Sequence, residues 1–336
     1  RPPPCLHGQD SIHICKKLLN SIDIPTLDVF LGEHRAVLGH AVMVRDAYSM
    51  EAHGTYSRDP TRKDRQNWET VQRLCKKKHI SCLEDMWKTG KERTRGTAEY
   101  LKVVHRYISI FFSKKLTVAA RAKSASFVIH FLARWRMWVL KHKGGLRACE
   151  NFITDEAYKD CVLSCHQVIL VIMASRDFCP QTPLALDQLG SDCCESFFSS
   201  HGSWVQNKRN YTNQHMVNQT RKILRLVQIA SSTNGPESGK GYCKRRDLWE
   251  EEDDESAPVP DLTDWPTDEE LVSAWNDGET EAMDLLEELG LKPEKSTHTV
   301  DEDTGEADWW PHLRCPVALD CQGAGALKGG DDDYTT

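Results

Sequence analysis

The chain has 336 residues, enough to bury a sizeable apolar core in one large domain or two ordinary ones. Its net charge of -7 conceals two opposite parts: residues 247–336 hold 28 acidic and 4 basic residues, whereas residues 1–246 hold 22 and 39. A basic body of this kind is typical of a protein that binds phosphates, although solvated lysine-rich helix faces give the same composition.

The 13 cysteines are an odd number and follow no small-domain disulfide spacing, so we expect reduced thiols in the nucleus or cytosol. The longest apolar stretch, residues 161–174, is interrupted by polar side chains and is too short to span a bilayer. We therefore expect no secretory signal, no transmembrane helix and no membrane partner.

Helical patterns dominate residues 1–230, and few segments alternate with a period of two, so we expect a mainly α (α+β) fold. A short helix is expected over residues 11–20, an irregular stretch over 31–66, and a basic helix over 67–86. Spacings of three and four then predict two long helices. Their apolar stripes are Leu101, Val104, Ile108 and Phe111, and Phe127, Phe131, Trp135 and Trp138.

Three further helices complete the body. Thr154 is expected to cap a helix that runs to about Ser175, with Asp155 and Glu156 in its first turn. Another helix is expected to begin near Asp192, and a last one to cover residues 212–230.

Residues 233–336 predict an acidic, largely disordered tail, because they combine low hydrophobicity with high charge. One helix is expected near 267–289, where Thr267 and Glu270 match a capping box. This tail has three interpretations: it folds back on the basic body and screens it from DNA, docks in a groove of a partner protein, or only solubilises the chain. The apolar face of the expected helix consists of Leu271, Trp275, Ala282, Leu285 and Leu289.

Two short segments stand out for their acidic residues. They are GQDSIHICKKLLN at residues 8–20 and GSDCCESFFS at residues 190–199. In this order, with helices between them, they resemble the Asp-x-x-His-x-x-Lys-x-x-x-Asn and Asp-x-x-Glu-x-Phe-Phe stretches of P-element-like (THAP-family) DNA transposases. The resemblance covers roughly residues 8–230.

The resemblance implies an incomplete RNase H-like core with a helical insertion. Residues 1–30 would be a remnant of the core with the second acid motif, and residues 31–185 a mostly helical insertion. Residues 186–232 would be the helical end of the core, followed by the tail at 233–336.

The resemblance also implies metal-dependent cleavage and transfer of DNA strands. An RNase H-like site holds two Mg²⁺ ions with three carboxylates, which suit this hard cation. Asp10 would be the second acid and Glu195 the third, and both would be catalytic metal ligands. GTP and a homo-oligomer follow from the family alone, since no residue here matches the family's nucleotide contacts.

The sequence departs from the family at its start, because the first acid precedes the second on an early strand and only nine residues precede Asp10. We therefore expect a fragment or an inactive relic that does not cut DNA by itself. Two other functions stay open: a domesticated, non-catalytic protein that binds DNA or chromatin, and a helical interaction scaffold.

Each acid also has a structural interpretation. Asp10 alone is typical of a helix N-cap, and His13 of a surface or capping histidine. Asp192 and Glu195 have the spacing of an N-cap and its partner in the first turn, a role that is compatible with metal binding.

Basic side chains of the body are candidates for contacts with DNA phosphates, which give affinity without reading sequence. Trp204 could stack on an unpaired base or belong to the core. Two groups, Cys75-His79-Cys82 and Cys161-Cys165-His166, lack the Cys-x-x-Cys spacing of zinc sites, so their thiols are expected to pack in the core. The candidate phosphate contacts are Lys16, Lys17, Lys76, Lys77, Lys78, Lys208, Arg209, Arg221, Lys222 and Arg225.

Overall fold

Several of the described helices begin at short polar side chains that cap them. The computed structural model describes residues 9–61, 64–90, 93–142, 144–190, 220, 249 and 258–291. In this part, six side chains accept hydrogen bonds from backbone N–H groups in the first turn of a helix. These six residues are Asp10, Ser49, Asn67, Thr117, Thr154 and Thr267.

The described chain is mainly helical, which confirms the coarser part of the expected fold class. Its first half consists of α1 (Ser11–Ser21), β1 (Val29–Leu31), β2 (His34–Ala36), α2 (Gly39–Ala47), α3 (Met50–His53), α4 (Trp68–Leu74) and α5 (Lys77–Lys88). The longer helices follow, and they are α6 (Arg95–Phe112), α7 (Val118–Lys141), α8 (Ala148–Asn151), α9 (Asp155–Phe178), the 3₁₀ turn η1 (Leu186–Gln188) and α12 (Asp268–Glu288).

Two local expectations are wrong. The single helix expected over residues 67–86 is two helices, because Lys76 is extended (φ -70°, ψ 149°) and separates α4 from α5. The stretch expected to be irregular, residues 31–66, contains most of a hairpin and the short helices α2 and α3. These helices are too short for a sustained apolar period to reveal them.

The hairpin of β1 and β2 turns at Gly32, whose φ of 63° suits glycine. Gly32 also lies against the carbonyl of Leu289, where a side chain would clash. Trp135 Nε1 donates a hydrogen bond of 2.7 Å to the carbonyl of Phe30 and ties the hairpin to α7. Within the described residues this is the one sheet, so the sheet of an RNase H-like core is not seen there.

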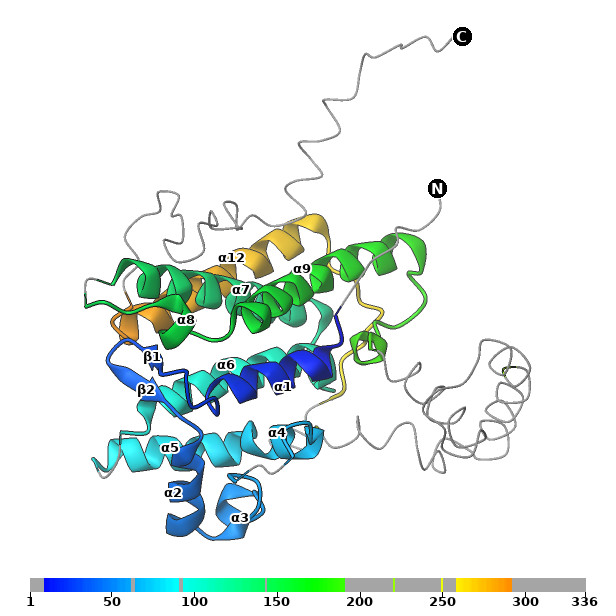
Figure 1. Cartoon of the computed structure of the whole chain (residues 1–336). Coiled ribbons are helices and arrows are strands. Elements are labelled where there is room, and N and C mark those ends of the chain that lie inside the picture. The colour runs from blue at the N-terminus through cyan, green and yellow to red at the C-terminus, as the bar shows by residue number, and fades with distance from the viewer. Residues whose placement is uncertain are drawn as a thin grey trace.

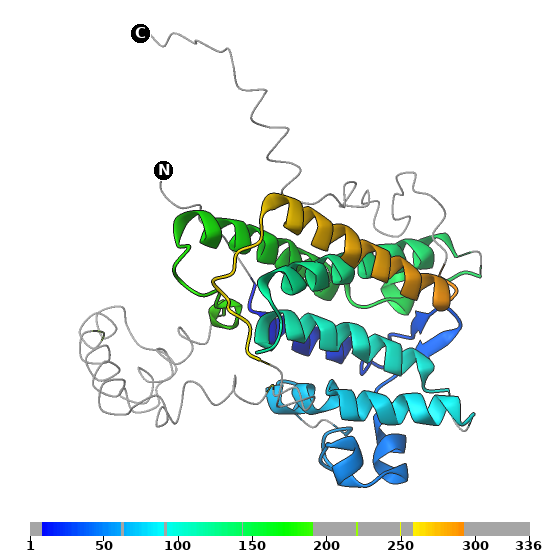
Figure 2. The ribbon, with the colours of Figure 1, turned by 180° about the vertical axis from the view of Figure 1, so that it is seen from behind.

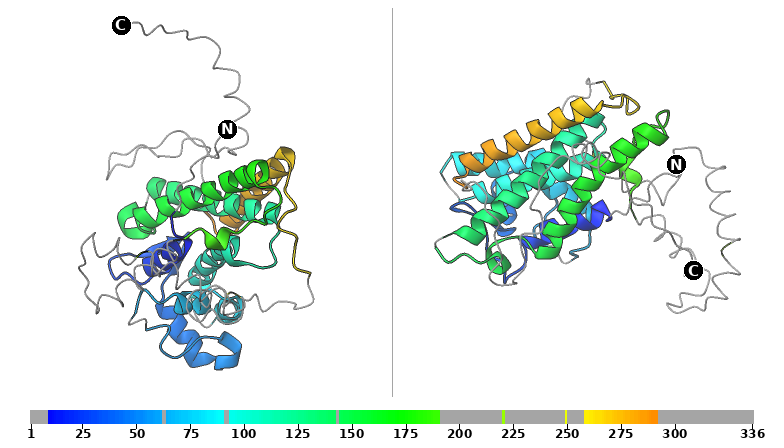
Figure 3. Two further views of the ribbon diagram at one scale, coloured as in Figure 1. Left: turned by 90° about the vertical axis from the view of Figure 1, so that its right-hand side faces the viewer. Right: turned by 90° about the horizontal axis from the view of Figure 1, so that it is seen from above.

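The helices lie in layers that Figures 1 and 2 show from opposite sides. The layer of α7, α9 and α12 lies above α1 and α6, and α4 and α5 lie below these, with α2 and α3 at the lower edge. Seen from above, α7 lies between α9 and α12 (Figure 3). Residues of α1, the long helices, η1 and α12 contribute to one buried apolar cluster, so the described elements share a core.

The acidic helix α12 packs in this core. Its capping box of Thr267 and Glu270 is present, as the sequence predicts. Leu271, Trp275 and Ala282 are buried as expected. Leu289 is buried too, so four of the five residues of the expected face are confirmed, whereas Leu285 is only partly buried and Leu286 is fully buried in its place.

The stretch expected to be a disordered tail therefore includes a segment, residues 258–291, that packs against the body. Gly278 lies against the backbone of α7 at Lys123, where a side chain would clash, and Ser126 Oγ donates a hydrogen bond of 2.6 Å to the carbonyl of Trp275. Trp249, within the expected linker, is also buried, with its ring centroid 5.0 Å from that of His105. Residues 292–336 lie outside the described part.

Candidate functional site

Asp10 is the N-cap of α1. Its Oδ1 accepts hydrogen bonds from the backbone N–H groups of Ile12 (2.9 Å) and His13 (3.4 Å). Its Oδ2 lies 3.3 Å from His13 Nδ1, and 10% of the Asp10 side chain is exposed. The structural interpretation of Asp10 as a cap is therefore confirmed, and the carboxylate is held in a fixed orientation at the rim of the core.

Gly190, the first residue of the second acid motif, lies beside Asp10. A methyl group at position 190 would be 3.4 Å from Oδ2 of Asp10. The turn η1 leads the chain there, and its Leu186 is buried in the core. The beginning of the second motif thus reaches the first, although Asp192 and Glu195 lie outside the described residues.

No group of three or more His, Cys, Asp and Glu side chains suited to a metal occurs among the described residues. On the described side, the site offers one oriented carboxylate, Asp10. A carboxylate is the ligand type that Mg²⁺ prefers, so the residue present fits the metal in part.

The thiols are core residues. Cys161 and Cys165 are fully buried on α9, as expected, and burial raises the pKa of the Cys161 thiol. Cys75 is also fully buried and Cys82 is nearly so. Such buried thiols are inert rather than nucleophilic.

His79 differs from these thiols, because it buries two strongly polar ring nitrogens. It is fully buried on α5, and neither ring nitrogen has a hydrogen-bond partner in the described part of the chain. Burial, together with the nearby His53, lowers the pKa of His79 to about 4. His79 is thus neutral at pH 7, and its polar atoms are a cost to folding.

Of the first two candidate phosphate contacts, one is buried and the other forms ion pairs with α9. Lys16 is buried at 8% exposure. Lys17 Nζ lies 2.7 Å from Asp160 Oδ2 and 3.5 Å from Glu156 Oε2, and the hydrogen bond with Asp160 raises the pKa of Lys17. A phosphate would have to compete with these two carboxylates of α9.

Lys77 and Lys78 are exposed at the beginning of α5, and Lys76 is half-buried before them. The five remaining candidates lie outside the described residues, as does Trp204. Those five are Lys208, Arg209, Arg221, Lys222 and Arg225.

An aromatic side chain that the sequence analysis did not single out is exposed in the loop between α3 and α4. Tyr56 follows α3 and is 48% exposed. The guanidinium carbon of Arg73 lies 4.5 Å from the centroid of its ring, and that of Arg58 lies 6.0 Å away. The Lys78 side chain lies beside Gly54, two residues before Tyr56.

Buried hydrogen bonds fix the backbone of this loop. Asp59 is fully buried and accepts hydrogen bonds from the Tyr56 backbone N–H (2.7 Å), from Thr70 (2.9 Å) and from Arg73 (2.7 and 2.9 Å). Burial raises the pKa of Asp59, but the bonds from Arg73 and Tyr56 outweigh it and lower the pKa below its usual value. Asp59 therefore stays ionised and holds both Tyr56 and Arg73.

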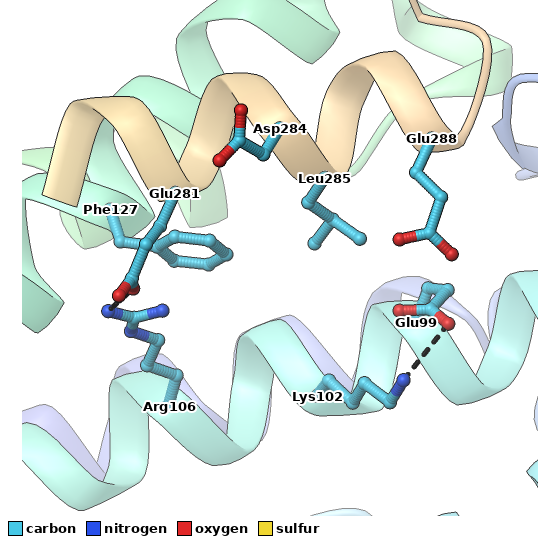
Figure 4. Close-up of a pocket in the computed structure, with 8 residues that line it drawn as sticks. All are labelled: Glu99, Lys102, Arg106, Phe127, Glu281, Asp284, Leu285 and Glu288. Carbon is cyan, nitrogen blue, oxygen red and sulfur yellow. Dashed lines mark hydrogen bonds and ion pairs between the residues drawn. The ribbon is translucent and has the colours of Figure 1, made fainter. Parts of the chain in front are cut away.

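A charged groove of about 400 Å³ lies between α6 and α12 (Figure 4). Arg106 Nη2 lies 2.5 Å from Glu281, which also pairs with Lys123 at 2.6 Å. Lys102 pairs with Glu99 at 3.0 Å. The ion pairs of Glu281 connect α12 to Arg106 of α6 and Lys123 of α7. The charges that line the groove are thus largely paired with one another, and we assign no ligand to it. Its lining is Glu99, Lys102, Arg106, Phe127, Glu281, Asp284, Leu285 and Glu288.

Among the described helices, α9 alone is long and apolar enough to cross a membrane. Its residues Cys161, Val162, Ile169 and Ile172 are buried in the core of the described structure. Core helices of globular proteins meet the same criteria of length and hydropathy, so α9 is only weak evidence for a membrane span, although it is longer than the apolar stretch that the sequence analysis took to be too short.

No protein-family model, curated protein or solved structure matches the chain. What the chain does must therefore be argued from its own residues and their arrangement.

Proposed function

We propose that the chain is part of an RNase H-like, P-element-like DNA transposase in which Asp10 and Glu195 supply two carboxylates of a two-metal site. The observation that carries this proposal is the contact between Asp10 and Gly190, because Gly190 opens the motif that contains Glu195. A resemblance that rests on two separate motifs requires that they meet in the folded chain. The contact supports such a meeting.

Magnesium would be the metal, and it would supply an activated nucleophile and charge stabilisation at the leaving oxygen. The chain's own contribution is to hold the Asp10 carboxylate in place through the first turn of α1. Two carboxylates bind Mg²⁺ weakly, so we do not propose that the chain cuts DNA by itself. A nuclear location, a homo-oligomer and GTP belong to the same proposal by family resemblance, and no described residue is assigned to them.

Metal titration of the full chain tests the proposal. Free Mn²⁺ would be followed by electron paramagnetic resonance for the wild type, Asp10→Asn, Glu195→Gln and the control Asp155→Asn. Asparagine caps helices as well as aspartate does, so Asp10→Asn removes a ligand but keeps the cap. We expect one weak site to disappear in both test variants and to persist in the control, whose aspartate lies in the first turn of α9.

Equal Mn²⁺ binding by the wild type and both test variants would contradict the proposal. Because the acidic tail binds cations nonspecifically, the difference between variants is the informative quantity. A loss in only one variant would equally contradict a shared site.

A second candidate function, non-catalytic DNA binding, is favoured by the exposed side chains of Arg58, Lys77 and Lys78. Contacts with phosphates release counterions, so binding must weaken as salt rises. The experiment is a titration of a DNA duplex with the full chain at several salt concentrations. Affinity that falls steeply with salt supports this function, whereas absence of DNA binding leaves the helical scaffold in its place.

A further inference from the structure

The acidic helix α12 lies along a row of cations on α6 and α7. Four basic side chains of these two helices form ion pairs with α12 and, within the described residues, with no other acid. We propose that the acids of α12 shield a phosphate-binding surface of α6 and α7, so that this face is masked from DNA. This inference rests on the second candidate function, DNA binding, and adds an autoinhibitory contact to it. The four cations are Arg95, Arg106, Lys123 and Arg134.

The first argument is the charge of the two helices that pack together. Five Lys and Arg side chains and no acid lie on α7, whereas α12 has nine acids and no Lys or Arg. The two helices run side by side (Figure 3). Among the α7 cations, Arg121 donates to backbone carbonyls and Arg136 pairs with Asp155 of α9. Lys123 and Arg134 depend on α12 for an acidic partner.

The second argument is the geometry at the centre of the row. The Glu281 carboxylate lies 2.5 Å from Arg106 Nη2 and 2.6 Å from Lys123 Nζ. Burial raises the pKa of Glu281, but the hydrogen bonds from Lys123 and Arg106 outweigh it and hold that pKa below its usual value. Figure 4 shows this carboxylate at the Arg106 guanidinium. One ionised acid of α12 thus occupies two cations of the body.

Two further acids of α12 extend the row. Glu288 lies 3.2 Å from Arg95, and Glu279 lies 4.0 Å from Arg134 and 3.7 Å from His130. The side chains of the four cations are between 15% and 34% exposed, so they lie at the rim of the contact with α12 and not in the core. A phosphate can reach such side chains when no carboxylate charge neutralises them.

The third argument is the account of the neighbouring acids. The one acid of α6 is Glu99, which pairs with Lys102, and Glu84 of α5 pairs with the same lysine. The acids of α9 pair with Lys17, Arg136, Lys159 and Arg176. Without the charges of α12, the four cations of the row would therefore have no acidic partner in the described structure.

Shielding of this kind needs no movement of α12. The helix is anchored by apolar packing, since Trp275 and Leu286 are buried and Gly278 lies against the backbone of α7. Glutamine has nearly the size of glutamate, so the charges can be removed while this packing stays. The inference can thus be tested on the folded full chain.

The test compares two triple variants that remove the same charge from residues 258–291. The paired-acid variant carries Glu279→Gln, Glu281→Gln and Glu288→Gln. The matched control carries Asp264→Asn, Glu269→Gln and Asp277→Asn, whose acids are exposed and form no ion pair among the described residues. Binding of a fluorescent DNA duplex is followed by anisotropy at several salt concentrations.

We expect the paired-acid variant to bind the duplex about 10-fold more tightly than the matched control at low salt. Its logarithmic salt slope should be steeper by about 2 to 4, because each new phosphate contact adds about 0.9. Adding Lys123→Gln and Arg134→Gln to the paired-acid variant should remove about half of this gain. Circular dichroism checks the fold, and Glu281→Gln alone, which releases two cations, should steepen the slope by about 1 to 2 if the triple variant unfolds.

Several results would overturn the inference. Equal tightening in the paired-acid variant and the matched control would show that only net charge matters, and it would leave the second candidate function intact. A gain that persists after Lys123→Gln and Arg134→Gln would place the new phosphate contacts elsewhere and would also contradict the shield. Absence of DNA binding by the wild type and by every variant would overturn both the shield and the second candidate function.

Discussion

The carboxylate of Asp59 holds the guanidinium of Arg73 with two hydrogen bonds of 2.7 and 2.9 Å, and the same carboxylate accepts the backbone N–H of Tyr56. This buried ion pair connects α4 to the loop before it. The loop that carries Tyr56 thus depends on one acid that is fully buried.

Removing the basic partner should be costly. Arg73→Met would leave Asp59 buried without its charge partner and should destabilise the fold by about 3 kcal/mol, whereas replacing both residues should cost less. Urea denaturation of Arg73→Met, Asp59→Asn and the double variant measures the coupling. Equal losses in Arg73→Met and in an exposed control such as Arg147→Met would contradict the importance of the pair.

The same pair predicts an acid dependence. Since the pKa of Asp59 is lowered in the folded chain, its stabilisation is present above the pKa of the unfolded chain, near 4, and is lost as the pH falls further. Asp59→Asn should make the unfolding free energy less dependent on pH below 4. A profile that is parallel to the wild type would show that Asp59 does not carry this dependence.

His79 predicts a second, separate pH window. Its folded pKa is about 4, below the unfolded value of about 6.5, so the unfolded chain binds more protons between these limits. The stability should therefore fall as the pH drops from 6.5 to 4, by about 1.4 kcal/mol per unit at most for this one group.

The variant His79→Leu isolates this contribution. It should flatten the decline between pH 6.5 and 4, and it should also remove two buried ring nitrogens that have no partner in the described structure. Urea midpoints of the two proteins at pH 7 and pH 5 suffice. If their difference is the same at both values, His79 is not the titrating group.

The close approach of α12 to α7 predicts that position 278 tolerates only glycine. A methyl group there would collide with the backbone of Lys123 and Phe127. Gly278→Ala should therefore cost about 1–3 kcal/mol, although alanine favours an isolated helix. Gly290→Ala, at a position with open space but a φ of 73°, is a useful comparison, because its cost would come from the backbone alone.

The Asp10 cap makes a prediction that separates structure from chemistry. Asp10→Ala removes the acceptor for two backbone N–H groups and should cost about 1 kcal/mol, whereas Asp10→Asn should be nearly neutral. Thermal denaturation of the two variants measures the difference. A large loss in Asp10→Asn would mean that the charge itself stabilises the fold, and metal titrations of that variant would need reinterpretation.

The sequence predicts the parts of the fold that local chemistry determines. The caps Asp10, Thr154 and Thr267 and the apolar stripes of α6 and α7 all appear where the pattern places them. The packing of α12 against α7 is a long-range relationship that no local period shows. Its acidic composition left open whether it folds back on the body, docks in a partner or stays in solvent, and its buried apolar face and Gly278 decide where it lies.

The candidate surface was predicted only in part. Lys77 and Lys78 are noticeable because they are consecutive in the sequence. Tyr56 is not, because Arg73, whose guanidinium lies against its ring, is on a different element, α4, and meets it only in the folded chain.

The most direct test of the central claim maps where a metal binds. Fe²⁺ replaces Mg²⁺ in carboxylate sites and, with ascorbate and peroxide, cleaves the nearby polypeptide backbone. The account predicts cleavage of the full chain near residue 10 and near residue 195, both suppressed by excess Mg²⁺ and lost in Asp10→Asn. Cleavage at neither position, or cleavage that Asp10→Asn leaves unchanged, would contradict a metal site shared by Asp10 and Glu195.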